Sequence, residues 1–234
     1  MIRPSCFVVA ALLSVGLAQA PSQTIFSGAT LIDGRGGPPI ANAVLIVRDG
    51  RVADVRVSDR PGSSGTVDVR GKFIIPGLIS AHAHISDVDG LKPRAYTAEN
   101  TARQLGVFAR YGVTTLWSLG GELPPAFAAR DAQNVATLDR ARIYLAGEII
   151  VATTPEAARE KVAAVAATKP DVIKIRVDDN LGAATKMPPA VYTAVIDEAH
   201  KRGLRDLDRD GHRLGRISRA LRRIFRAPRI GDDG

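Results

Sequence analysis

The chain has 234 residues, of which 45% are hydrophobic and 24% are charged, a composition typical of globular proteins that excludes a disordered or collagen-like chain. This length suits one or two domains. The formal net charge of +8 would by itself favour an anionic partner such as nucleic acid, but residues 205–234 hold nine Arg and five Asp and so carry half of it.

Residues 1–20 have the three parts of a secretory signal peptide. Arg3 precedes an apolar run over residues 7–17, and Ala18-Gln19-Ala20 supplies the small residues of a cleavage site. The run is shorter than the roughly 20 residues that cross a bilayer, so no stable membrane anchor is expected. The pattern predicts export to the periplasm or secretion. The only cysteine, Cys6, lies in this segment, which excludes disulfides and a catalytic thiol from the cleaved chain.

Residues 21–75 read as short strands separated by turns. Alternating apolar residues flank the pair Asp49-Gly50, and an Asp-Gly pair in that setting is a strong signal for a β-hairpin. We expect a small β-sandwich-like domain here.

Residues 76–204 alternate between apolar strand-like runs and helical stretches, which predicts a parallel sheet with right-handed crossovers. Thr154 and Pro155 occupy the favoured first positions of one helix, and Gly203 ends another. Four units could be half of a closed barrel or a small open sheet. The expected strands are 78–85, 113–119, 142–151 and 171–177, and the expected helices are 97–111, 126–132, 154–168 and 188–202.

His82 and His84 stand two residues apart at the end of the first of these strands. Residues at this spacing point to one face of a strand, so both imidazoles can bind a single metal ion. Two histidines this close also occur by chance on protein surfaces, and the motif alone leaves that alternative open.

Lys174 lies inside the apolar run of the fourth expected strand. A buried ammonium group is costly, so the side chain either reaches the surface, pairs with Asp178 or Asp179, or has a chemical role.

Two stretches of the sequence carry a family resemblance. GATLIDGRGGPPIANAVLIVRDGRVADV is followed by GKFIIPGLISAHAHI, which contains the approach Ile75-Pro76-Gly77-Leu78 and then His82 and His84. Residues 25–204 resemble the metal-dependent amidohydrolase superfamily, in particular its imidazolonepropionase-like and dipeptidase-like members. The resemblance implies an α/β fold class: a partial (β/α)8 TIM-type barrel, consisting of its first four βα units, after a small N-terminal β-sandwich-like domain. A whole barrel takes about 250 residues, so the chain has room for only part of one.

The resemblance also implies a site and a reaction. His82 and His84 would bind one divalent ion, with zinc as the expected metal, and Lys174, carbamylated by carbon dioxide, would bridge it to a second. A metal-activated hydroxide would then attack a carbon–nitrogen bond of a small amide or dipeptide substrate. The family commonly has an aspartate two residues before the first histidine, and Ser80 stands there instead.

The family pattern needs two further histidines and an aspartate from later strands, and these are not evident. His200 lies in a helical stretch and His212 lies in the arginine-rich segment. We therefore assign no catalytic residue, and the alternative to an enzyme is a non-catalytic fragment or binding module.

Residues 205–234 are basic, with apolar residues at helical spacing and no apolar run for a fifth strand. This tail is either an aberrant, out-of-frame segment or a basic helix for an anionic surface. No nucleic acid partner is expected for an exported protein. An acidic run, 206–211, matches the start of an EF-hand loop, but Ile217 replaces the closing glutamate and argues against calcium binding. A partial barrel leaves strand edges open, which predicts homo-oligomers or aggregation.

Overall fold

The computed structural model describes residues 23–58, 65–90, 92, 96–179, 181–183 and 185–204, and the backbone of 206–208. The predicted signal peptide and most of the basic tail lie outside these residues. The chain divides into two compact units, Met1–Pro76 and Gly77–Gly234.

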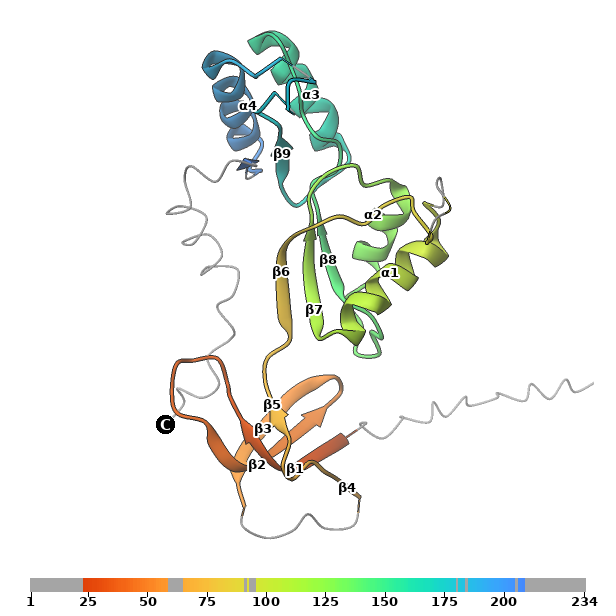
Figure 1. Cartoon of the computed structure of the whole chain (residues 1–234), viewed down its shortest axis with the longest axis vertical. Helices are drawn as coiled ribbons and strands as arrows, with labels where there is room; N and C mark the ends of the chain where they lie inside the picture. The colour runs from red at the N-terminus through yellow and green to blue at the C-terminus, as the bar shows by residue number, and fades with distance from the viewer. Residues whose placement is uncertain are drawn as a thin grey trace, which may run out of the picture. The chain divides into compact units, whose positions relative to one another are not determined.

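The first unit is a single mixed sheet of five strands: β1 (Gln23–Leu31), β2 (Ile40–Arg48), β3 (Arg51–Val57), β4 (Thr66–Asp68) and β5 (Phe73–Ile74). The strand order is β3-β2-β1-β4, and β5 also pairs with β1 (Figure 1). The predicted hairpin is confirmed, because Asp49 and Gly50 join antiparallel β2 and β3 with φ angles of 50° and 73°. The structure does not confirm the expected sandwich. The described residues of this unit form one sheet, and β3 is exposed along its whole length.

The second unit contains four successive strand–helix pairs, as predicted. They are β6 (Leu78–Ala83) with α1 (Ala98–Arg110), β7 (Val113–Ser118) with α2 (Pro124–Asp131), β8 (Arg142–Leu145) with α3 (Pro155–Ala167), and β9 (Ile173–Ile175) with α4 (Pro189–Lys201). Strands β6, β7 and β8 form a parallel sheet in that order.

Local signals set the ends of the helices. The Thr154 side chain accepts a hydrogen bond from the backbone N–H of Ala157 at the start of α3, and Pro155 follows it in the first turn. Thr97 caps α1 in the same way through Asn100. Gly203, at φ 72°, follows the end of α4. These hydroxyl caps satisfy N–H groups that have no partner within the helix.

The fourth strand differs from the prediction in its pairing. β9 is not a direct neighbour of β8; it pairs in parallel with β10 (Asp206–Asp208) in a separate two-stranded sheet. An isolated bridge between Ile150 and Ile175 links it to the segment after β8. The expectation that no fifth strand follows α4 is wrong, because backbone pairing with the open edge of β9 does not require apolar side chains.

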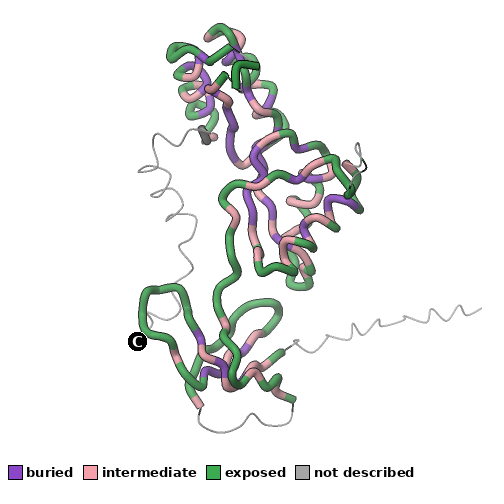
Figure 2. Tube along the Cα trace, viewed as in Figure 1, coloured by how far each residue is buried: buried purple, intermediate pink, exposed green. Residues whose placement is uncertain are grey.

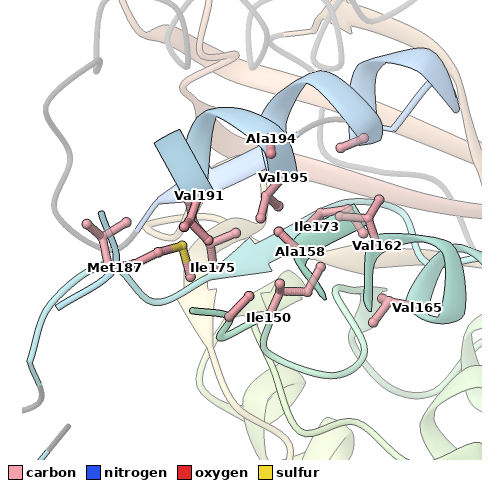
Figure 3. Close-up of a cluster of buried hydrophobic side chains, with 13 residues drawn as sticks. Ile150, Ala158, Val162, Val165, Ile173, Ile175, Met187, Val191, Ala194 and Val195 are labelled. Carbon is pink, nitrogen blue, oxygen red and sulfur yellow. The ribbon is translucent and has the colours of Figure 1, made fainter. Parts of the chain in front are cut away.

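Two large apolar clusters and a smaller one, formed by Trp117, Leu119, Ala146 and Val172, fill the second unit, whose buried residues are purple in Figure 2. One packs α1 and α2 against the sheet and includes Leu105, Leu116, Ile143 and Leu145. The other packs α3 and α4 around β9 (Figure 3) and includes Val162, Val195 and Ile173. Among the described residues, no helix is long and apolar enough to cross a membrane.

Candidate metal centre

The two predicted histidines lie at the carboxyl end of β6. Ala83, between them, packs against the cluster beneath α1 and α2. Since successive side chains along a strand point to opposite faces, His82 and His84 lie on the face away from these helices. Both side chains are exposed.

The structure brings the two imidazoles together. Their Nε2 atoms are 3.2 Å apart, and the ring centroids are 5.2 Å apart. Two nitrogens bound to one tetrahedral zinc ion at about 2.05 Å stand roughly 3.3 Å apart. The pair therefore fits two ligands of a single ion, and the same distance suits a hydrogen bond when one ring donates to the other.

The other nitrogen of His84 has a backbone partner. Its Nδ1 lies 3.4 Å from the carbonyl oxygen of Gly120, in the loop after β7. A proton on Nδ1 leaves the Nε2 lone pair available, which is the arrangement that metal-binding histidines commonly use.

Ser80 does not replace the missing aspartate at the imidazoles. Its hydroxyl donates to the backbone carbonyl of His82 at 3.2 Å. This contact joins two residues of β6, so it stabilises the strand and does not orient an imidazole ring.

Lys174 is at the centre of β9 and only 4% exposed. Its neighbours Ile173 and Ile175 belong to the cluster beneath α3 and α4, so Lys174 points to the face away from those helices. Its backbone carbonyl accepts a hydrogen bond from the N–H of Ile150 at 2.8 Å. The alternative in which the Lys174 side chain reaches the surface is therefore wrong, while its role as a metal ligand stays a prediction.

A third histidine among the described residues, His200, lies on α4 and is exposed, as predicted, and His212 lies outside the described residues. Within the described part of the chain, no three His, Cys, Asp or Glu side chains gather as a metal site.

Comparison with known proteins adds independent information. No protein-family model matches the chain. The L-hydantoinase of Paenarthrobacter aurescens is 34% identical over 87 residues, which cover 37% of this chain and 18% of that protein. Among solved structures, a prolidase from Bifidobacterium longum is 25% identical, with a TM-score of 0.66 over 80% of this chain and 49% of its own. A Xaa-Pro dipeptidase with bound methionine in its active site has a TM-score of 0.66 at 21% identity, over 80% of this chain and 56% of its own.

The curated relatives and the solved structures together indicate the amidohydrolase superfamily. The resemblance carried by the sequence motifs is thereby confirmed, and these relatives are hydrolytic enzymes. The chain spans about half the length of these solved structures and less than a fifth of the hydantoinase.

One buried carboxyl group near the histidines is not predicted by the sequence. Glu122, in the loop after β7, is 6% exposed and accepts hydrogen bonds from the Ser118 hydroxyl at 2.7 Å and from the N–H groups of Gly120 at 2.8 Å and Gly147 at 2.7 Å. Burial raises the pKa of Glu122, and these hydrogen bonds act in the opposite direction. Its position after a strand, between a Gly pair and a Pro pair, is the only sequence signal.

Proposed function

We propose that this amidohydrolase is a metal-dependent hydrolase that cleaves a carbon–nitrogen bond in a small amide or dipeptide. The observation that carries the proposal is the pair of Nε2 atoms 3.2 Å apart at the carboxyl end of β6. The carboxyl ends of parallel strands are where α/β folds place their ligand sites. The activities of the relatives, which act on carbon–nitrogen bonds, support the same chemistry.

A divalent ion such as zinc, when bound, supplies acidified water and a polarised carbonyl oxygen. His82 and His84 would hold it through Nε2, and the Gly120 carbonyl would keep the proton of His84 on Nδ1. These two side chains therefore bind and orient the ion.

Carbamylation of Lys174 would supply an oxygen ligand for a second ion. The neutral amine forms a nitrogen–carbon bond to carbon dioxide and loses a proton, so that a carboxylate replaces a potential cation. The 4% exposure of Lys174 supports this role, because burial penalises the charged ammonium form relative to the neutral amine that reacts with carbon dioxide.

We further propose that the protein is exported, on the strength of the signal-peptide pattern in residues 1–20. Its partners are then small-molecule substrates, namely dipeptides and N-acylated or cyclic amides. Exposed strand edges such as that of β3 favour association into homo-oligomers.

Zinc titration of the purified chain by calorimetry, followed by metal analysis after dialysis, tests the proposal. We expect stoichiometric zinc in the wild type and its loss in the variants His82→Ala and His84→Ala. His200→Ala, which changes an exposed histidine on α4, is the matched control and should retain the metal. Equal zinc binding in all four proteins, or none in the wild type, contradicts the proposal.

Activity is measured on the same samples with dipeptides, N-acylated amino acids and cyclic amides, with and without added bicarbonate. Turnover that depends on zinc and on both histidines supports the hydrolase. Stoichiometric zinc without turnover on any of these substrates favours the non-catalytic binding module instead.

A further inference from the structure

The carboxyl group of Glu122 joins the loops that follow two neighbouring strands. Oε1 accepts from Ser118 and from the N–H of Gly120, both near the end of β7, and Oε2 accepts from the N–H of Gly147, which follows β8. All three partners donate, which suits a carboxylate, since an ionised carboxyl group only accepts. At 6% exposure, water contributes little to this arrangement.

Two contacts connect this carboxyl group to His84. Gly120 donates its N–H to Glu122 and turns its carbonyl oxygen toward Nδ1 of His84, 3.4 Å away. Ser118 donates to Glu122 and accepts the N–H of Ile85, the residue after His84, at 2.9 Å. One contact reaches the imidazole ring, and the other holds the backbone next to it.

The geometry of Gly120 leaves little freedom in the first contact. Its φ angle is 118°, and a Cβ built there would overlap the side chain of Ile149. The Gly120 carbonyl shares a peptide plane with the N–H of Gly121, which donates to the carbonyl of Gly147 at 2.9 Å. Glu122 holds the N–H groups of both Gly120 and Gly147, so it fixes the backbone on the two sides of this contact.

We propose that Glu122 is a positioning residue for the metal ligand His84: through Gly120 it places the proton of His84 on Nδ1, and through Ser118 it fixes the backbone at Ile85, so that Nε2 faces the ion. The proposal rests on the proposed metal centre. Glu122 itself needs no contact with the metal or the substrate, and it acts at a sequence distance of 38 residues from His84.

The replacement Glu122→Gln removes the charge at nearly constant volume. A glutamine directs an NH₂ group, a donor, toward at least one of the three donors, so that one contact becomes repulsive. Glu148→Gln is the matched control, because Glu148 is exposed and lies in the loop after β8, next to Gly147.

The first measurement is the tautomer of His84 in the metal-free protein, read from imidazole ¹⁵N chemical shifts at one fixed pH. We expect the Nδ1–H form in the wild type and in Glu148→Gln, and a mixture of the two tautomers in Glu122→Gln. A merely structural role would leave the tautomer unchanged. This measurement does not need zinc, so it distinguishes failure of the positioning role from failure of the metal centre.

The second measurement is zinc affinity by competition with a chelating dye. Removing the groups that orient a histidine ligand typically weakens metal binding roughly 10- to 100-fold, and we expect a loss in this range for Glu122→Gln and none for Glu148→Gln. An unchanged His84 tautomer together with unchanged zinc affinity in Glu122→Gln overturns the proposal.

Ser118→Ala keeps the proposal testable if Glu122→Gln fails to fold. It removes the contact to Ile85 and leaves the N–H of Gly120 bonded to Glu122. We expect the wild-type tautomer of His84 with zinc binding weakened several-fold. Wild-type zinc affinity in Ser118→Ala, or a changed tautomer, contradicts the two-contact arrangement.

Discussion

The two apolar clusters of the second unit should unfold together, and a matched pair of isoleucines can test this. Ile143 lies on β8 in the cluster beneath α1 and α2, and Ile173 lies on β9 in the cluster beneath α3 and α4; both are 0% exposed. The two strands belong to different sheets. Cooperative unfolding therefore depends on the contacts that join the clusters.

These contacts surround the start of β9. The N–H of Asp171 donates to the carbonyl of Leu145 at 2.8 Å, while the carboxyl group of Asp171 accepts the N–H of Leu145 at 2.9 Å. A third cluster, composed of Trp117, Leu119, Ala146 and Val172, packs across the same region. Because polar and apolar contacts coincide here, we expect one unfolding transition.

The magnitude follows from the buried atoms. Changing isoleucine to alanine removes three carbons, worth about 2.4 kcal/mol in transfer free energy, and the remaining cavity brings the cost to about 3.5 kcal/mol. For a unit of this size the melting temperature should fall by roughly 10 °C. Ile143→Ala and Ile173→Ala should shift the same transition by similar amounts. Ile79→Ala, at a residue that is 41% exposed, is the control and should shift it little.

Scanning calorimetry and chemical denaturation, followed by circular dichroism, provide the measurement. Two resolved transitions, with Ile143→Ala lowering one and Ile173→Ala lowering the other, would refute the reasoning. That result would mean that the two clusters are separate folding units.

Three further predictions concern single contacts. Thr154→Ala removes the cap of α3 and should lower the unfolding free energy by about 1 kcal/mol, whereas Thr154→Ser should retain most of it, as measured by urea denaturation. Gly120→Ala should destabilise the fold, because φ is 118° and the new Cβ would overlap Ile149; wild-type stability of this variant would argue against the backbone geometry. Burial raises the pKa of Glu122 above its ordinary 4.5. The folded chain therefore holds this proton more tightly than the unfolded chain does. The contribution of Glu122 to the free energy of unfolding should fall as the pH rises from about 4.5 through the folded pKa, and it should stay constant above that pKa. Subtracting the pH profile of Glu122→Gln from that of the wild type should isolate this slope, and parallel profiles would contradict it.

Sequence signals predict the structure well where the cause is local. The Asp49-Gly50 hairpin and the Thr154 cap depend on residues within a few positions, and both form as expected. The spacing of His82 and His84 is equally local, since two residues on a strand share a face.

The sequence fails to predict the structure where contacts between residues far apart in the chain determine it. The apolar run over residues 142–151 suggests one long strand, but β8 ends at Leu145. Gly147 turns the chain with a φ angle of 74°, and its N–H is bound by Glu122, 25 residues away. No periodic pattern marks such a contact, so both the end of β8 and the role of Glu122 require the three-dimensional structure.

The alternation of side chains along β6 and β9 connects the folding of the unit to its proposed chemistry. Ala83 points toward one cluster, and Ile173 with Ile175 points toward the other; the predicted ligands occupy the alternate positions and point away from the helices. The histidines and Lys174 are therefore held by different clusters. A change that loosens Asp171 from Leu145 would shift Lys174 relative to the histidines without altering any of the three side chains, so the proposed metal binding by all three would depend on the contacts that make the unit fold as one.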